Sequence, residues 1–112
     1  MNYTAEELKG IIREATAAGR DAADAAYAKN GNSDWDACGF AWVNLYNIKG
    51  NTRLGKALKA AGIRQDYDRA FHFNANNCYT GQSISIKEAA CDAACAVFRR
   101  YGFTAYVGSR LD

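Results

Sequence analysis

The chain has 112 residues, a formal net charge of +2 at neutral pH and no proline. This length suits a single folded domain whose core needs no disulfide or metal to hold it together. The near-neutral charge and a pI ≈ 8.4 exclude an acidic mimic of DNA, and they permit nucleic-acid binding without indicating it. The sequence has no apolar run of membrane-spanning length and no apolar signal segment after Met1. We therefore expect a soluble, intracellular protein.

The first expected element is a helix that begins at Thr4. Thr4 and Glu7 have the spacing of a capping box, and Leu8 and Ile11 start an apolar face. Further along, the helix becomes rich in alanine. Alanine buries little area, so this half must either pack closely or be weakly held. The helix is expected to end by residue 31.

A strand and a basic helix are expected next. Residues 40–46 alternate as a pleated strand does, and both of its faces are largely apolar, which predicts a central strand covered on both sides. The helix that follows is capped by Asn51 or Thr52 and closed by Gly62, a glycine at the position that favours a left-handed conformation.

The last third predicts a short strand at 70–73, a long loop at 74–82, a helix and a final strand at 103–107. Ser85 and Glu88 have capping-box spacing, and Gly102 closes this helix. The apolar stripe of the helix is wide, which indicates burial against the sheet and a second contact. We interpret the second contact as a homodimer interface through Cys91, Cys95 and Phe98.

These elements predict an α/β (α+β) fold in one domain, 1–112. The expected order is α-β-α-β-α-β, with a small three-stranded sheet and three packed helices. Within it, the N-terminal helix occupies 1–31 and a β-α-β-α-β unit occupies 38–112.

The first candidate site is the turn between the expected strand at 40–46 and the basic helix. Backbone N–H groups at a helix start, with cations beside them, suit an anion such as phosphate. The pattern does not have Walker spacing, and an ordinary glycine turn with solvated charges is the simpler interpretation. The residues of this turn are Lys49, Gly50, Asn51, Thr52 and Arg53.

The second candidate site is the polar loop at 74–82. If this loop and the first turn meet at one edge of the sheet, they form a single polar site, and Arg110 after the last strand would support it. The alternative is that the asparagines only serve turn geometry. The loop residues proposed for binding are Asn74, Asn76, Asn77, Tyr79 and Gln82.

The spacing of the thiols and the histidine does not predict a specific site. Cys91 and Cys95 are four residues apart on a helix, and His72 and Cys78 would be needed to complete four zinc ligands. Cysteine also packs as a small apolar residue, and no pattern here matches a zinc knuckle or a catalytic pair. We therefore expect no metal, no cofactor and no catalytic residue, and the sequence does not decide whether these thiols and His72 act in function.

Four blocks are similar to small proteins of unassigned activity carried by bacteriophages and other mobile elements. They are CGFAWV at 38–43, KGNTRLGKA at 49–57, SIKEA at 85–89 and YGFTAYVGSRLD at 101–112. The resemblance covers about two-thirds of the chain, excluding the first helix. It implies a viral protein in the cytoplasm of a host cell, and it brings no reaction and no site residue.

The leading functional hypothesis is a non-enzymatic accessory protein that binds a macromolecular partner, a host protein, through the turn at 49–53 and the loop at 74–82. One alternative is a protein that binds a nucleotide or another small phosphate-bearing ligand. Another is a nucleic-acid-binding module that uses Arg53, Lys56, Lys59 and neighbouring aromatic residues.

Overall fold

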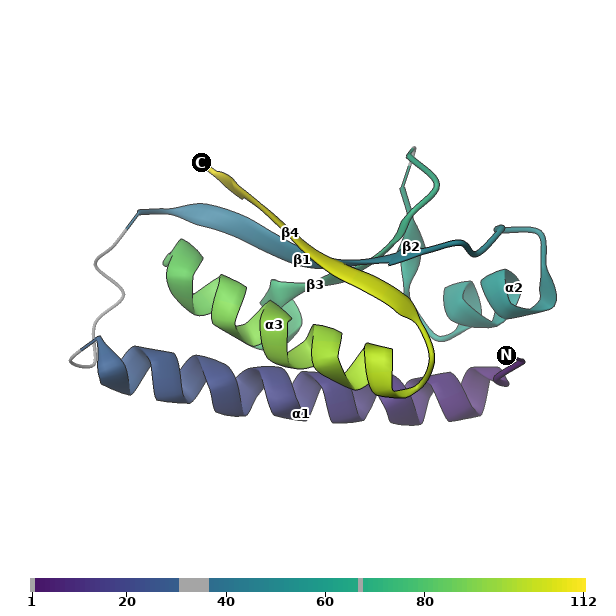
Figure 1. Cartoon of the computed structure of the whole chain (residues 1–112), viewed down its shortest axis with the longest axis horizontal. Helices are drawn as coiled ribbons and strands as arrows, with labels where there is room; N and C mark the ends of the chain where they lie inside the picture. Colours follow the sequence, from purple (N-terminus) through teal and green to yellow (C-terminus); the bar gives the residue numbers. More distant parts are fainter. Residues whose placement is uncertain (1, 31–36, 67) are drawn as a thin grey trace.

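The computed structural model of the chain describes residues 2–30, 37–66 and 68–112. It confirms the α+β class, and none of the described helices is both long and apolar enough to span a bilayer. Figure 1 shows a sheet with the two longer helices along one of its faces. The elements, in chain order, are α1 (Ala5–Lys29), β1 (Gly39–Tyr46), α2 (Arg53–Ala60), β2 (Arg64–Gln65), β3 (Phe71–Asn74), the 3-10 helix η1 (Ala75–Asn77), α3 (Ile84–Arg100) and β4 (Thr104–Leu111).

The sheet has four strands in the order β2-β3-β1-β4, and all neighbouring strands are antiparallel. The predicted three-stranded sheet and the order α-β-α-β-α-β are therefore wrong, because a β2–β3 hairpin lies between α2 and α3. β2 has only two residues, too few for any alternation to show in the sequence. β1 lies between β3 and β4, so these two strands are parallel to each other and α3 connects them in a split β-α-β unit.

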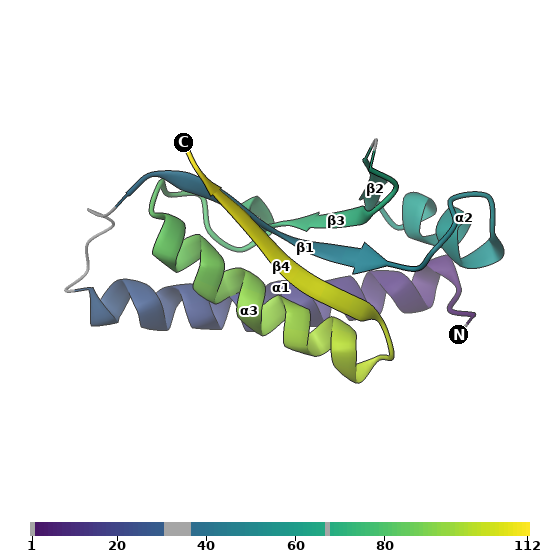
Figure 2. The ribbon, with the colours of Figure 1, turned by 45° about the horizontal axis from the view of Figure 1, so that its top comes forward.

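Both long helices pack on the same face of this sheet, as the two views in Figures 1 and 2 show. Ala41, Val43 and Leu45 of β1 point to this face and are buried. The expectation that β1 is covered on both sides is wrong, since α1 and α3 share one side and α2 lies at the end of the sheet. The largest side chains of the resulting core are Phe71, Phe73, Phe98, Leu8, Leu45, Leu58 and Ile86.

The alanine-rich half of α1 packs closely on α3, which answers the question that the sequence left open. Ala15, Gly19 and Ala23 are buried. A β-carbon added at Gly19 would overlap the Cys78 sulfur and would lie 3.1 Å from the backbone oxygen of Ala90. The small residues thus let the two helices approach at backbone distance.

The wide apolar stripe of α3 is buried by contacts within the chain. Cys91, Cys95 and Phe98 are 0%, 2% and 0% exposed, because α3 packs against both α1 and the sheet. The second contact that the stripe predicts is therefore α1. This corrects the expectation of a spare apolar face and removes the surface on which the homodimer was based.

Most of the helix ends follow the local rules read from the sequence. The Thr4–Glu7 capping box is present, and Thr52 caps α2 by accepting from the Gly55 N–H. Gly62 and Gly102 have φ of 98° and 93°, as glycines that end helices often do. The cap of α3 differs: Ser83, and not Ser85, accepts from the Ile86 N–H.

Candidate functional site

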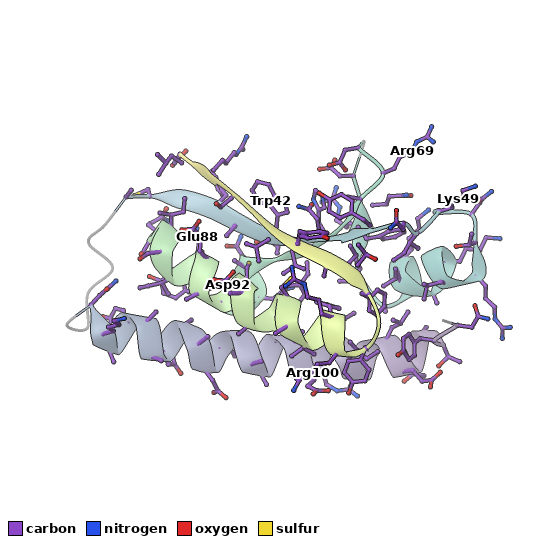
Figure 3. The ribbon with its side chains drawn as sticks, in the orientation of Figure 1. Trp42, Lys49, Arg69, Glu88, Asp92 and Arg100 are labelled. Atoms are coloured by element: carbon purple, nitrogen blue, oxygen red, sulfur yellow. The ribbon has the colours of Figure 1, made fainter. Side chains whose placement is uncertain are left out.

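The sheet face that turns away from α1 and α3, which we call the open face, carries three of the five exposed large hydrophobic side chains of the described chain. Side chains alternate between the faces along each strand, and residues paired across strands share a face. Figure 3 shows Trp42 on this face and Glu88 and Asp92 on α3, below the sheet. The open face consists of Phe40, Trp42, Asn44, Tyr46, Arg64, His72, Asn74, Thr104, Tyr106, Gly108 and Arg110.

Trp42 lies at the centre of the open face. Its indole is stacked beside the His72 ring at 6.2 Å between centroids, and its Nε1 donates to Asn44 Oδ1 at 3.1 Å. Gly108, the cross-strand neighbour of Trp42, leaves room for the ring, since a β-carbon there would come within 2.6 Å of Nε1. Contacts on several sides therefore hold the indole in one orientation.

Tyr46 and Tyr106 form the second aromatic group of the open face. Their rings are 5.9 Å apart, and the side chains are 40% and 55% exposed. Arg99 reaches from α3 to this group: its Nε donates to the Ala105 carbonyl at 2.8 Å and its guanidinium lies 5.3 Å from the Tyr106 ring. An exposed aromatic pair thus has a fixed cation beside it.

Phe40 forms the third group, at the other end of β1. The Arg110 guanidinium and the Lys87 ammonium lie 5.2 and 5.3 Å from the centre of its ring. Lys87 is buried and donates to the Gly39 carbonyl at 2.8 Å. β3 does not extend to this position, so Lys87 supplies the donor that a neighbouring strand would otherwise give.

The charged residues are unevenly distributed along the chain, although the net charge is only +2. Residues 37–65 contain five cationic residues and no acidic one. By contrast, α1 alone carries five acidic residues against four cationic ones. Asp66 and Asp68 are acidic side chains next to the open face, and both lie beside His72. The surface made by β1, α2 and β2 is therefore predominantly basic.

The predicted turn at 49–53 joins β1 to α2 at one end of the sheet. The Lys49 carbonyl accepts from the Thr52 hydroxyl at 2.6 Å and from the Thr52 N–H at 3.2 Å. The Gly50 carbonyl accepts from Lys59 Nζ at 3.3 Å. Lys49, Asn51, Thr52 and Arg53 are exposed and Gly50 is half-buried, so the turn presents polar groups on a hydrogen-bonded frame.

The predicted loop at 74–82 lies at the opposite end of the sheet. β1 and β3 are antiparallel, so the turn after β1 and the loop after β3 leave the sheet in opposite directions. The Gln82 carbonyl accepts from the Gly39 N–H at the start of β1, and Arg110 pairs with Phe40 at that same end. The structure therefore does not bring the two candidate segments together into one site.

Within this loop, the asparagines differ in their roles. Asn74 Oδ1 accepts from the Asn76 N–H at 2.9 Å and caps η1, as the turn-geometry interpretation predicts. Asn76, Asn77 and Gln82 are exposed and Tyr79 is half-buried. Of the loop residues, Asn74 belongs to the open face.

The thiols and His72 do not form a metal site. His72 is on the open face, whereas Cys91 and Cys95 are buried on α3 below the sheet. Burial raises the pKa of the Cys91 thiol to about 12, and it also raises the pKa of Cys78 and of Cys95. Buried thiols with raised pKa values are poor nucleophiles and poor ligands.

His72 instead lies close to two carboxylates of the β2–β3 hairpin. Its Nδ1 is 3.6 Å from Asp66 Oδ2 and its Nε2 is 3.8 Å from Asp68 Oδ1. The ligand atoms of these three residues lie within 4.8 Å of one another. Asp68 Oδ1 already accepts from the Ala70 N–H at 3.0 Å, and exposed carboxylates beside a histidine are common without an ion. We therefore assign this cluster a role in holding the hairpin.

Several residues of the open face were not predicted as site residues, and the pattern in β1 offered a way to find them. The even positions Phe40, Trp42 and Tyr46 carry large aromatic rings, while the odd positions carry the smaller Ala41 and Val43. Rings on one face of a strand, with compact residues on the other, are compatible with an open face as well as with a buried one. Two further large aromatic residues of the sequence, Trp35 and Tyr67, lie outside the described residues.

Comparisons with protein-family models, with curated proteins and with solved structures found no match to this chain. The resemblance to bacteriophage proteins stays a prediction.

Proposed function

We propose that this protein is a non-catalytic binding protein that holds single-stranded nucleic acid on the open face. One observation carries the proposal: exposed aromatic rings and cations lie together on a sheet face that no described element covers. Tyr106 contributes the most exposed ring of this face, and Phe40 and Tyr46 follow with equal exposure.

The chemistry of the open face suits an unpaired strand. Bases of a single strand stack on aromatic side chains, whereas bases in a duplex already stack on each other and are not available to protein rings. Arg64 and Arg110 lie among the rings, where they can contact phosphates. Asn74, which is exposed, adds a polar group for base edges.

The charge distribution favours a polyanion over an uncharged or basic partner. The basic surface of 37–65 adjoins the open face, and phosphate contacts supply most of the affinity in sequence-independent binding. A host protein as the partner is the alternative that the sequence suggested, since proteins also use Tyr and Trp as anchors. Binding to a polyanion with an affinity that falls as salt rises would favour nucleic acid over a host protein.

The test is a fluorescence anisotropy titration with labelled single strands of thymidine and of uridine nucleotides. Strands of about 12 nucleotides match the usual site size of a protein with stacking platforms. We expect binding to the single strands and weaker binding to a duplex of the same length. If no single strand binds at low salt, the proposal is rejected, and a host protein becomes the leading hypothesis for the partner.

The matched variants are Tyr106→Ala and Tyr27→Ala. Both side chains are exposed, but Tyr106 lies on the open face and Tyr27 lies on α1. Loss of one stacking ring is expected to cost about 1–3 kcal/mol of binding free energy for Tyr106→Ala, and Tyr27→Ala should bind as the wild type does. Equal effects of the two variants would place binding elsewhere.

A further inference from the structure

A cavity of about 870 Å³ lies at the end of the open face. One of its walls is the turn after β1, with Lys49 and Gly50, and the other is the β2–β3 hairpin, with Gln65 and Arg69. Tyr46 lines the cavity and also belongs to the open face. Figure 1 shows the hairpin projecting above the sheet and the turn lying beyond the end of β1. Through Tyr46, the open face continues into the cavity.

Each wall is held by a hydrogen bond of its own, and the two walls pack closely against each other. Lys59 Nζ donates to the Gly50 carbonyl at 3.3 Å, and Gln65 Nε2 donates to the Arg69 carbonyl at 3.1 Å. A β-carbon at Gly50 would overlap the Gln65 side chain and would lie 2.9 Å from Lys59 Nζ. The shape of the cavity is thus set by the fold around it.

Three cations line the cavity: Lys49, Lys59 and Arg69. Within the part of the chain that the structure describes, neither Lys49 nor Arg69 pairs with a carboxylate. The acidic lining residue is Asp68, whose Oδ1 accepts from the Ala70 N–H and lies 3.8 Å from His72. The excess of positive charge is therefore available to an anion, and Figure 3 shows Lys49 and Arg69 at this end of the molecule.

We propose that this cavity binds the terminal phosphate of the single strand that lies on the open face. The identity of the strand rests on the proposed function. Both walls lie at the end of the sheet. A nucleic-acid strand that lies along the open face would therefore place its terminal nucleotide between them. A terminal phosphate monoester carries about −1.5 to −2 charges near pH 7, against one for each internal phosphate, and cations without carboxylate partners favour the more highly charged group.

The experiment compares single strands that differ only in a phosphate at the 5′ or the 3′ end. We expect one of the two terminal phosphates to tighten binding by roughly tenfold, the gain that a single charge-assisted hydrogen bond provides. The double variant Lys49→Gln/Arg69→Gln should lose this gain, so that it binds strands with and without the terminal phosphate equally tightly. Arg13→Gln/Lys29→Gln removes the same two charge types from α1 and should keep the gain.

The possible outcomes separate this inference from the proposed function. Binding that is equally tight with and without either terminal phosphate overturns the cavity assignment and leaves the open face in place. If no strand binds, the proposed function fails, and an NMR titration with uridine monophosphate and with uridine decides the cavity alone. Shifts of the Gly50, Asn51 and Arg69 amides with the monophosphate only would support a phosphate site, and their absence would overturn it.

Discussion

Cys38 and Cys91 have the same side chain in opposite environments. Cys38 is exposed just before β1, whereas Cys91 is buried on α3. Burial is the main cause that raises the pKa of Cys91 to about 12, and the thiol of Cys78 and the carboxylate of Asp92 add to it. Because the thiolate is the reactive form, a raised pKa leaves Cys91 protonated and unreactive near neutral pH.

We therefore predict that a thiol reagent at about pH 8 modifies Cys38 rapidly and modifies Cys91 only after unfolding. The measurement is mass spectrometry of the labelled protein after short and long exposure, with and without denaturant. Cys38→Ser should remove the rapid labelling. Rapid labelling of Cys91 in the folded protein would show that α3 is not packed as described.

At the scale of the elements, the contact between α1 and α3 decides how the alanine-rich helix is held. Gly10 and Gly19 are both in α1 but meet different surroundings. At Gly10 the nearest atom to an added β-carbon is 3.7 Å away, an ordinary contact. At Gly19 the same carbon would overlap Cys78.

The same substitution should therefore have opposite effects at these two positions. Gly10→Ala is expected to raise the free energy of unfolding by about 0.5–1 kcal/mol, since alanine loses less conformational entropy in a helix. Gly19→Ala is expected to lower it by about 1–3 kcal/mol, because α1 must move away from the Cys78 side chain and from the α3 backbone at Ala90. Urea denaturation measures both values, and a stabilising Gly19→Ala would contradict the close packing.

On the scale of the whole molecule, the fold separates an open face with a basic neighbourhood from a face covered by two helices. The formal charge of +2 averages over this difference. The cations that serve the open face come from separate elements: Arg64 from β2, Arg99 from α3 and Arg110 from β4. They meet on one side of the molecule because the strands pair and α3 runs beneath them.

We predict that the affinity for single strands falls with salt, with a slope of log K against log salt of about −2. This slope corresponds to roughly three phosphate contacts on a single strand. Arg110→Gln should make the slope shallower by about 0.7, and Arg13→Gln on α1 should leave it unchanged. The slope comes from titrations between about 50 and about 200 mM salt. A flat response would exclude phosphate contacts and favour a protein partner.

Part of the fold and of the candidate site could be predicted from the sequence. The capping box at Thr4, the cap at Thr52 and the closing glycines depend on atoms a few residues apart. The turn at 49–53 was located correctly between a strand and a helix, and its cations at Lys49 and Arg53 are exposed. Its relation to the loop at 74–82 could not be predicted, since it depends on the antiparallel pairing of β1 with β3.

By itself, the sequence determined the alternation of β1, the three helices and most of their ends, because these follow from contacts between near neighbours in the chain. Only the tertiary structure decided that α1 and α3 share one face of the sheet, and thereby which rings remain exposed. The alternation of Phe40, Trp42 and Tyr46 is compatible with a strand covered on both sides as well as with a strand covered on one side. Which face a helix covers is set by packing between segments that are far apart along the chain, and no local pattern records that choice.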